Sequence, residues 1–209
     1  MAFNVRKISS FREIDYFQLK SALASYANPH AKIRQLLAKG ALIRVKKGLY
    51  VLGEDYTEQP ITLEVLANLI YGPSAISLEY ALFHYGLIPE RVQAVTSITP
   101  KRNKQFDTPV GRFTYQYLPM GKYRSGLTRL ALADKRHVMF ATPEKALIDK
   151  IYLSKSLSLE TDNDIEVYLF SDLRLDEQQL HKLDINIFSE IALVYNNNNV
   201  KLVNDYLKR

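Results

Sequence analysis

The chain has 209 residues, of which 47% are hydrophobic and 24% charged, and its net charge is +6; this is the composition of a globular protein with one large or two small domains. It contains no cysteine, which excludes disulfides and thiolate metal sites and is typical of a reducing compartment. The sequence has no apolar signal core at its start and no run of about 18 apolar residues, so we expect a cytoplasmic protein with no membrane partner.

Charge is distributed unevenly along the chain. Residues 1–52 hold ten Lys and Arg against two acids, a net +8, and residues 101–136 hold nine against two, a net +7. Residues 53–100 and 154–209 are net acidic, at −5 and −4. Two basic blocks separated by acidic ones predict two surfaces that face polyanions, or one such surface and one that docks on an acidic partner.

The first basic block begins with signals for a helix. Asp15 with Gln18, and Ser10 with Glu13, have the spacing of a capping box, so a helix begins at one of these places. Apolar residues then recur at helical spacing over residues 16–24. The short stretch before Asp15 leaves room for at most one further short helix.

A second helix follows a turn at residues 25–27. Asn28 is suited to the N-cap and Pro29 to the first helical position, where its missing N–H costs nothing, while Gly40 is suited to the end. The residues predicted to face inward are Ile33, Leu36 and Leu37.

Two short β-type runs come next, residues 41–45 and 49–51, and Gly48 suits the left-handed position of the loop between them. A helix-turn-helix followed by a hairpin with Lys46 and Lys47 at its tip is the outline of a winged helix-turn-helix. We therefore predict a DNA-binding domain over residues 1–55.

The polar face of the second helix carries amide and basic groups and almost no carboxylates. Asn and Gln pair with adenine edges, Arg and Lys reach guanine or phosphate, and the hairpin lysines would contact phosphate without reading sequence. A solvated charged helix face is the alternative. The predicted DNA-binding residues are Asn28, His30, Lys32, Arg34, Gln35, Lys39, Lys46 and Lys47.

A polar segment ending in Pro60 marks the predicted boundary to a larger domain, residues 56–209. Its predicted elements are helices at 63–71 and 78–85, capped by Thr62 and Ser77; a small antiparallel sheet over 94–141; a helix at 143–154 capped by Thr142; and acidic helices at 163–170, 176–183, 187–195 and 200–208. The fold class expected is α+β.

The second basic block is interleaved with aromatic residues, a combination that nucleic-acid surfaces use for stacking and charge. The alternative is that the aromatics face the core of the sheet while basic residues occupy its turns and wet face. A third possibility is docking on an acidic protein or on a tRNA-like substrate bound by a partner. The candidate partner or nucleic-acid surface consists of Lys101, Arg102, Lys104, Arg112, Lys122, Arg124 and Arg129.

Catalytic motifs are absent from the sequence. The four histidines have no zinc spacing, and no phosphate-binding glycine loop or nucleophile elbow is present. Asp162 and Asp164 form a D-x-D pair of the kind that metal-dependent nucleotidyltransferases use, but without a Gly-Ser turn before it, and an acid cluster at a helix N-terminus is the simpler interpretation. We expect no enzymatic activity, metal or cofactor.

Several ordered motifs resemble the AbiEi family of antitoxins over roughly residues 15–155. In the N-terminal part they are LLAKG (36–40) and KGLY (47–50). Further along they are ISLEYAL (76–82), YGLIPE (85–90), TPKR (99–102), TPVGRF (108–113) and TPEKALID (142–149).

The resemblance implies a two-domain antitoxin of a type IV toxin–antitoxin system linked to abortive phage infection. Such a protein binds inverted repeats at its own promoter through the winged helix and represses it. Its C-terminal domain neutralises a nucleotidyltransferase toxin. A stand-alone transcriptional regulator and a protein-interaction module without specific DNA binding are the alternatives.

Overall fold

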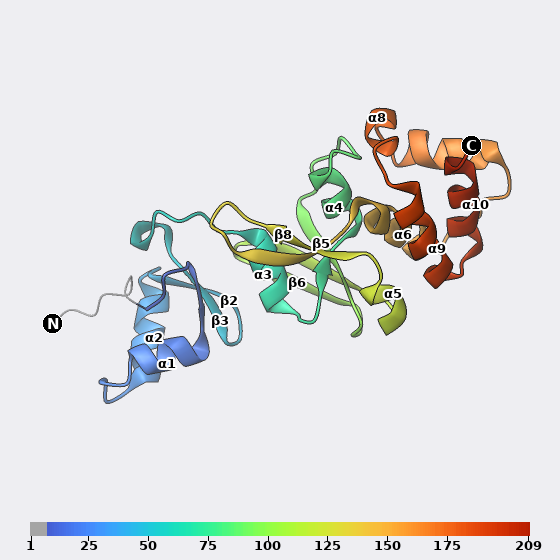
Figure 1. Ribbon diagram of the computed structural model, residues 1–209. Coiled ribbons are helices and arrows are strands. Elements are labelled where there is room, and N and C mark those ends of the chain that lie inside the picture. Colours follow the sequence, from blue (N-terminus) through green and yellow to red (C-terminus); the bar gives the residue numbers. More distant parts are fainter. Residues whose placement is uncertain (1–7) are drawn as a thin grey trace.

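Two sheets organise residues 8–209, the part of the chain that the computed structural model describes (Figure 1). The first is a three-stranded antiparallel sheet in the N-terminal unit, with strand order β1-β3-β2. The elements of this unit are β1 (Glu13–Asp15), α1 (Tyr16–Ala22), α2 (Pro29–Ala38), β2 (Leu42–Lys46) and β3 (Leu49–Leu52).

Local capping chemistry fixes both N-terminal helices. Asp15 and Gln18 form the reciprocal capping box of α1, each side chain accepting from the other's backbone N–H at 2.8 Å. The side chain of Asn28 accepts from the N–H of Ala31 at 3.0 Å and Pro29 occupies the first position of α2. The predicted helices are confirmed, and of the two candidate starts for α1 it is Asp15 that caps the helix.

The β2–β3 hairpin has a different environment on each face. Its turn is Lys47-Gly48, since Lys46 already pairs with Leu49, and Gly48 has a φ of +86°, as the predicted left-handed position requires. Leu42, Tyr50 and Leu52 on one face pack with α1 and α2, whereas Val45, Leu49 and Val51 join the large hydrophobic cluster of the following unit. The hairpin therefore lies between the two units and is not a free finger.

The second sheet has six strands in the order β6-β7-β5-β4-β9-β8. They are β4 (Ala75–Ile76), β5 (Ala94–Thr99), β6 (Lys104–Thr108), β7 (Gly111–Tyr117), β8 (Leu127–Ala131) and β9 (His137–Ala141). Strands β5 and β7 run parallel, as do β4 and β9, so the prediction of a small antiparallel sheet was wrong. Side-chain alternation does not reveal strand direction, and the two residues of β4 are too few to show a period.

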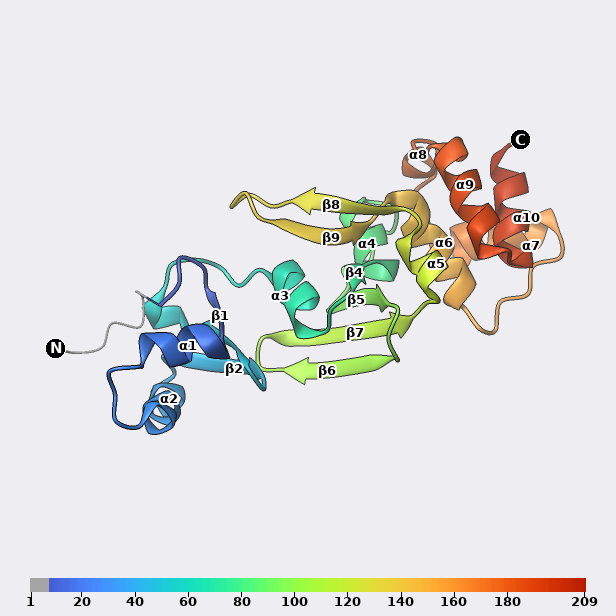
Figure 2. The ribbon, with the colours of Figure 1, turned by 60° about the horizontal axis from the view of Figure 1, so that its bottom comes forward.

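Helices cover this sheet and continue beyond it (Figures 1 and 2). A short 3₁₀ turn, η2 (Glu54–Tyr56), links the units, and helices α3 (Leu63–Ile70), α4 (Leu78–His84), α5 (Met120–Arg124) and α6 (Pro143–Leu153) belong to the second unit. Helix α5 lies within residues 94–141, the range of the predicted sheet. Helix α6 begins as predicted, with the Thr142 hydroxyl accepting from the N–H of Lys145 at 3.3 Å.

The remaining helices gather at the C-terminal end, shown in orange to red in Figure 1. They are α7 (Asp162–Glu166), which continues as the π-helical turn η3 (Val167–Asp172), then α8 (Glu177–Leu180), α9 (Ile185–Tyr195) and α10 (Asn198–Leu207). The four predicted helical segments are confirmed to within a few residues. Within residues 8–209 no helix combines the length and the apolar composition needed to cross a membrane.

Two polar junctions tie the N-terminal unit to the second unit. Arg136, in the β8–β9 turn, forms an ion pair with Glu13 of β1 at 2.5 Å and donates to the Thr62 hydroxyl at 3.2 Å. At the hairpin, the ammonium group of Lys46 donates to the carbonyl oxygen of Ile70, at the end of α3. The carbonyl end of a helix attracts cations, so the hairpin is anchored on the second unit by charge as well as by apolar packing.

Candidate nucleic-acid interface

The outward face of α2 is open to solvent. Asn28, His30, Arg34, Gln35 and Lys39 are exposed, while Ile33 and Leu36 are buried as predicted. The face carries two cations, two amides and an imidazole, and it has no carboxylate. These are the side-chain types that read base edges in a major groove.

Lys32 lies at the margin of that face and is partly buried. Its ammonium group donates to the side-chain oxygen of Gln35 at 2.9 Å and sits 5.3 Å from the centre of the Tyr26 ring. The amide of Gln35 is therefore held by its neighbour, which limits the directions in which it can present its N–H groups.

The two lysines predicted at the hairpin tip have different environments. Lys47 is exposed, and it has no hydrogen-bond or ion-pair partner among the described residues. Lys46 turns away to the carbonyl oxygen of Ile70, and burial, followed by the charge of the nearby Lys101, lowers its pKa. The side chain of Lys46 therefore serves the junction between the units, whereas Lys47 is the lysine that extends outward.

Arg44 is a cation that the sequence analysis did not single out. It lies on β2 opposite Tyr50, with an exposed side chain between the partly buried Ile43 and the buried Val45. The sequence signal for its exposure was the alternation along this strand, in which Arg44 stands between two apolar residues.

A hollow of about 800 Å³ lies between α1, α2 and the β2–β3 hairpin. Within it the imidazole of His30 stacks on the ring of Tyr16, with centroids 6.1 Å apart, and lies 3.4 Å from the Tyr16 hydroxyl. The Phe17 side chain is 78% exposed although it is large and apolar. The hollow is lined by Asp15, Tyr16, Phe17, His30, Arg44, Lys47, Gly48 and Tyr50.

The second basic block does not form one surface. Strands β6 and β8 are the two edges of the six-stranded sheet, so Arg129 on β8 lies at the opposite edge from Lys104 on β6. Arg112 pairs with Asp107 at 2.6 Å, and Lys122 donates to the Tyr152 hydroxyl at 3.1 Å. The exposed members of the block are Lys101, Arg102, Lys104, Arg112, Arg124 and Arg129.

Most of the interleaved aromatics belong to the core. Phe113 and Tyr115 are buried, Tyr123 is 7% exposed, and Phe106 packs against Tyr115 with ring centres 5.9 Å apart. For these residues the simpler alternative, that sheet aromatics face inward, is correct. Tyr117 differs, since it is 49% exposed.

Lys145 and Asp149 form a fully buried ion pair at 3.2 Å. The Lys145 ammonium also donates to the Tyr195 hydroxyl at 2.7 Å, and the Asp149 carboxylate accepts from the Ser77 hydroxyl at 2.6 Å. Burial raises the pKa of Asp149 and lowers the pKa of Lys145, and the attraction between the two charges opposes both shifts. With both side chains 0% exposed, the cluster joins α4, α6 and α9 and is closed to substrates.

The D-x-D carboxylates have structural partners. Asp164 completes a capping box with Thr161 at the start of α7, and these hydrogen bonds from Thr161 hold its pKa below the usual range. Asp162 pairs with Arg209. Across the described residues no cluster of three His, Asp or Glu has the arrangement of a metal site.

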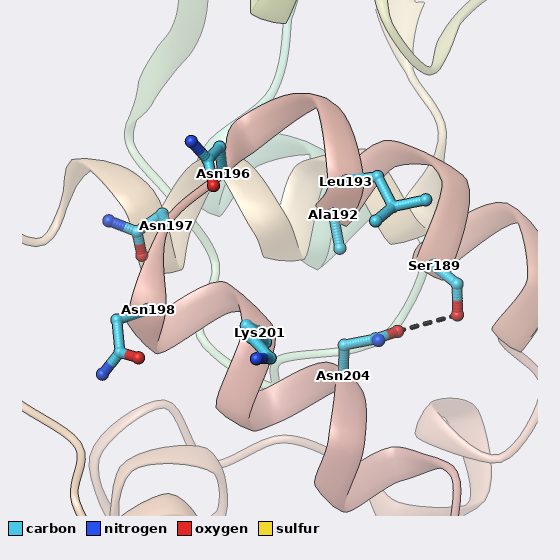
Figure 3. A pocket seen from close by; sticks show the side chains of 8 residues that line it. All are labelled: Ser189, Ala192, Leu193, Asn196, Asn197, Asn198, Lys201 and Asn204. Carbon is cyan, nitrogen blue, oxygen red and sulfur yellow. Dashed lines mark hydrogen bonds between the residues drawn. The ribbon is translucent and has the colours of Figure 1, made fainter.

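A further hollow of about 320 Å³ lies between α9 and α10 (Figure 3). Three of its polar residues have structural roles at the turn or between the two helices. Asn196 takes the left-handed position that ends α9, Asn197 caps α10, and Asn204 accepts from the Ser189 hydroxyl at 2.8 Å. Turn and capping chemistry therefore accounts for Asn196 and Asn197, and a hydrogen bond between the two helices accounts for Asn204.

No protein-family model and no curated protein matches this chain. Among solved structures, the fold is similar to the crystal structure of the RV2827C protein from Mycobacterium tuberculosis, with a TM-score of 0.64 at 15% sequence identity. The match covers 93% of this chain and 70% of that one. At this identity the likeness concerns the fold alone.

Proposed function

We propose that this protein binds double-stranded DNA through a winged helix-turn-helix formed by its N-terminal unit, and that it represses its own promoter. The element order β1-α1-α2-β2-β3 with the sheet order β1-β3-β2 supports the assignment. The observation that carries the proposal is the exposed, carboxylate-free face of α2, next to the hairpin cations Arg44 and Lys47, which have no hydrogen-bond or ion-pair partner within residues 8–209.

In this proposal α2 enters the major groove. Gln35 and Asn28 present amides to adenine edges, and Arg34 reaches guanine or phosphate. Arg44 and Lys47 contact the phosphate backbone, which fixes the register of the protein on the duplex without reading its sequence. Lys46 is left out of the interface because it holds the hairpin on α3.

We further propose that the protein is an antitoxin of the AbiEi type that neutralises a nucleotidyltransferase toxin. The support is the ordered set of motifs. Two of them, ISLEYAL and TPEKALID, contribute Ser77, Lys145 and Asp149 to the same buried cluster. In this proposal those motif residues maintain the fold of the second unit, and the contact with the toxin or its substrate is made elsewhere on the surface.

One variant separates the DNA-binding half of the proposal from the antitoxin half. Arg34→Ala with Gln35→Ala removes two exposed groups from α2 and leaves the buried face untouched. We expect it to lose repression of a reporter fused to the protein's own promoter, yet to keep protecting cells against the toxin encoded beside it. Deleting residues 1–55 is a poorer test, because it would expose the apolar surface that Val45 and Leu49 cover.

Lys201→Ala with Lys208→Ala, two exposed cations on or next to α10, is the control and should repress normally. Unchanged repression by the α2 variant would contradict the DNA-binding half of the proposal. Failure of the wild-type protein to protect against the neighbouring gene product would contradict the antitoxin half and leave a stand-alone regulator.

A further inference from the structure

The junction at the hairpin brings the two basic blocks of the sequence together. Lys46 donates to the carbonyl oxygen of Ile70, and Lys101 donates to that of Gly72 at 2.5 Å. Their ammonium groups therefore occupy adjacent positions at the end of α3. Two like charges are held here by the carbonyl group of Ile70 at the end of α3 and by that of Gly72 just beyond it.

Beyond this junction the surface stays basic. Arg102 and Lys104 are exposed, and Arg102 has no hydrogen-bond or ion-pair partner in the part of the chain that the structure describes. An open hollow of about 750 Å³ lies here, lined by Tyr71, Pro100, Lys101, Arg102, Asn103 and Tyr117. The acid on this edge, Asp107, is neutralised by Arg112.

The basic residues follow one side of the molecule. Figure 2 shows α2, the hairpin tip and edge strand β6 along its lower side, and the arrow of β6 points toward the hairpin. Lys104, the first residue of β6, is therefore at the far end of that edge. The basic band runs from Arg44 and Lys47 past Lys101 to Arg102 and Lys104, and Lys46 belongs to the junction and not to the band.

We propose that this basic band binds the phosphate backbone of the duplex that flanks the operator. The inference rests on the proposed DNA-binding function and extends it, because the second unit then contributes to affinity. Strand β6 has five residues, which at about 3.4 Å per residue span roughly 17 Å, or about five base-pair steps. Exposed cations next to the exposed Tyr117 and the amide of Asn103 favour a nucleic-acid backbone as the partner.

The test compares a duplex that ends at the operator with one extended by ten base pairs on each side. The proteins are the wild type, Arg102→Glu with Lys104→Glu, and Arg129→Glu with Lys135→Glu. The last variant is the control: it makes the same change of charge at β8 and the β8–β9 turn, on the opposite edge of the sheet. Affinity is measured by fluorescence anisotropy at fixed salt.

We expect the wild type and the control to bind the longer duplex about tenfold or more tightly than the shorter one, as two or more additional phosphate contacts would give. The Arg102 and Lys104 variant should lose this gain and bind the short duplex to within a fewfold of the wild type. If that variant gains as much affinity from the longer duplex as the wild type does, the proposed role of the basic band is wrong, while the winged-helix proposal is unaffected. No binding of the wild type to either duplex would remove the DNA-binding proposal itself.

Discussion

Lys145 and Asp149 are the residues with the largest expected effect on stability. A buried ion pair gains little over a well-packed apolar pair, because desolvation offsets the attraction, but removing one partner leaves an uncompensated charge. Here the pair is also bonded to Ser77 and Tyr195, so it connects three helices of the second unit.

We expect Asp149→Asn to lower the free energy of unfolding by about 3–5 kcal/mol, since Lys145 would lose its countercharge while staying buried. Urea denaturation followed by circular dichroism measures the change. Lys145→Met together with Asp149→Leu should recover part of the loss, because neither charge then remains. A double variant as unstable as Asp149→Asn would contradict this account of the pair.

At the scale of the secondary-structure element, the β2–β3 hairpin depends on a left-handed backbone at its turn. Gly48 has a φ of +86°, and a Cβ added there would meet no atom within 4 Å. A substitution at this position therefore costs backbone energy alone, without a steric clash. The hairpin depends on this turn to keep Arg44 and Lys47 on the outer surface.

We expect Gly48→Ala to lower the free energy of unfolding by about 1 kcal/mol, the cost of a left-handed conformation for an L residue. Gly121→Ala is the matched control, because Gly121 lies in helix α5 without a positive φ and also has nothing near its added Cβ. It should be neutral or slightly stabilising. Equal destabilisation by both substitutions would show that conformation at Gly48 is not the cause.

The same elements indicate how far the sequence could predict the structure. Asp15, Asn28 and Gly48 act within three or four residues of their own position, so their roles followed from spacing. Ser77 and Thr62 were predicted as caps, but their hydroxyl groups contact Asp149 and Arg136, 72 and 74 residues away. Long-range partners of this kind leave no local pattern.

In the candidate interface, too, local features could be predicted from the sequence and long-range contacts could not. The exposed face of α2 followed from helical periodicity, as did the inward position of Ile33 and Leu36. The inward turn of Lys46 did not, since it depends on where α3 ends in space. Nor did sequence order reveal that Lys104 and Arg129, 25 positions apart, lie at opposite edges of one sheet.

At the scale of the whole molecule, the N-terminal unit is fixed to the second unit at two places. One is the pair of the buried Glu13 with the partly buried Arg136, and the other is the hairpin with Lys46 and its apolar face. Since the hairpin is held by the second unit, the backbone positions of Arg44 and Lys47 relative to α2 are set by the fold. Preorganised contacts of this kind reduce the entropy that binding must overcome.

The most direct test is the salt dependence of binding to the protein's own promoter. If α2 and the hairpin contact about six phosphates, log K should fall against log salt with a slope of roughly −5, at about −0.9 per phosphate. Arg44→Glu with Lys47→Glu should make that slope shallower by about 2 and weaken binding to all duplexes alike. If the wild type binds its promoter and the variant shows the same slope, the hairpin does not belong to the interface. That result would contradict the proposed winged helix.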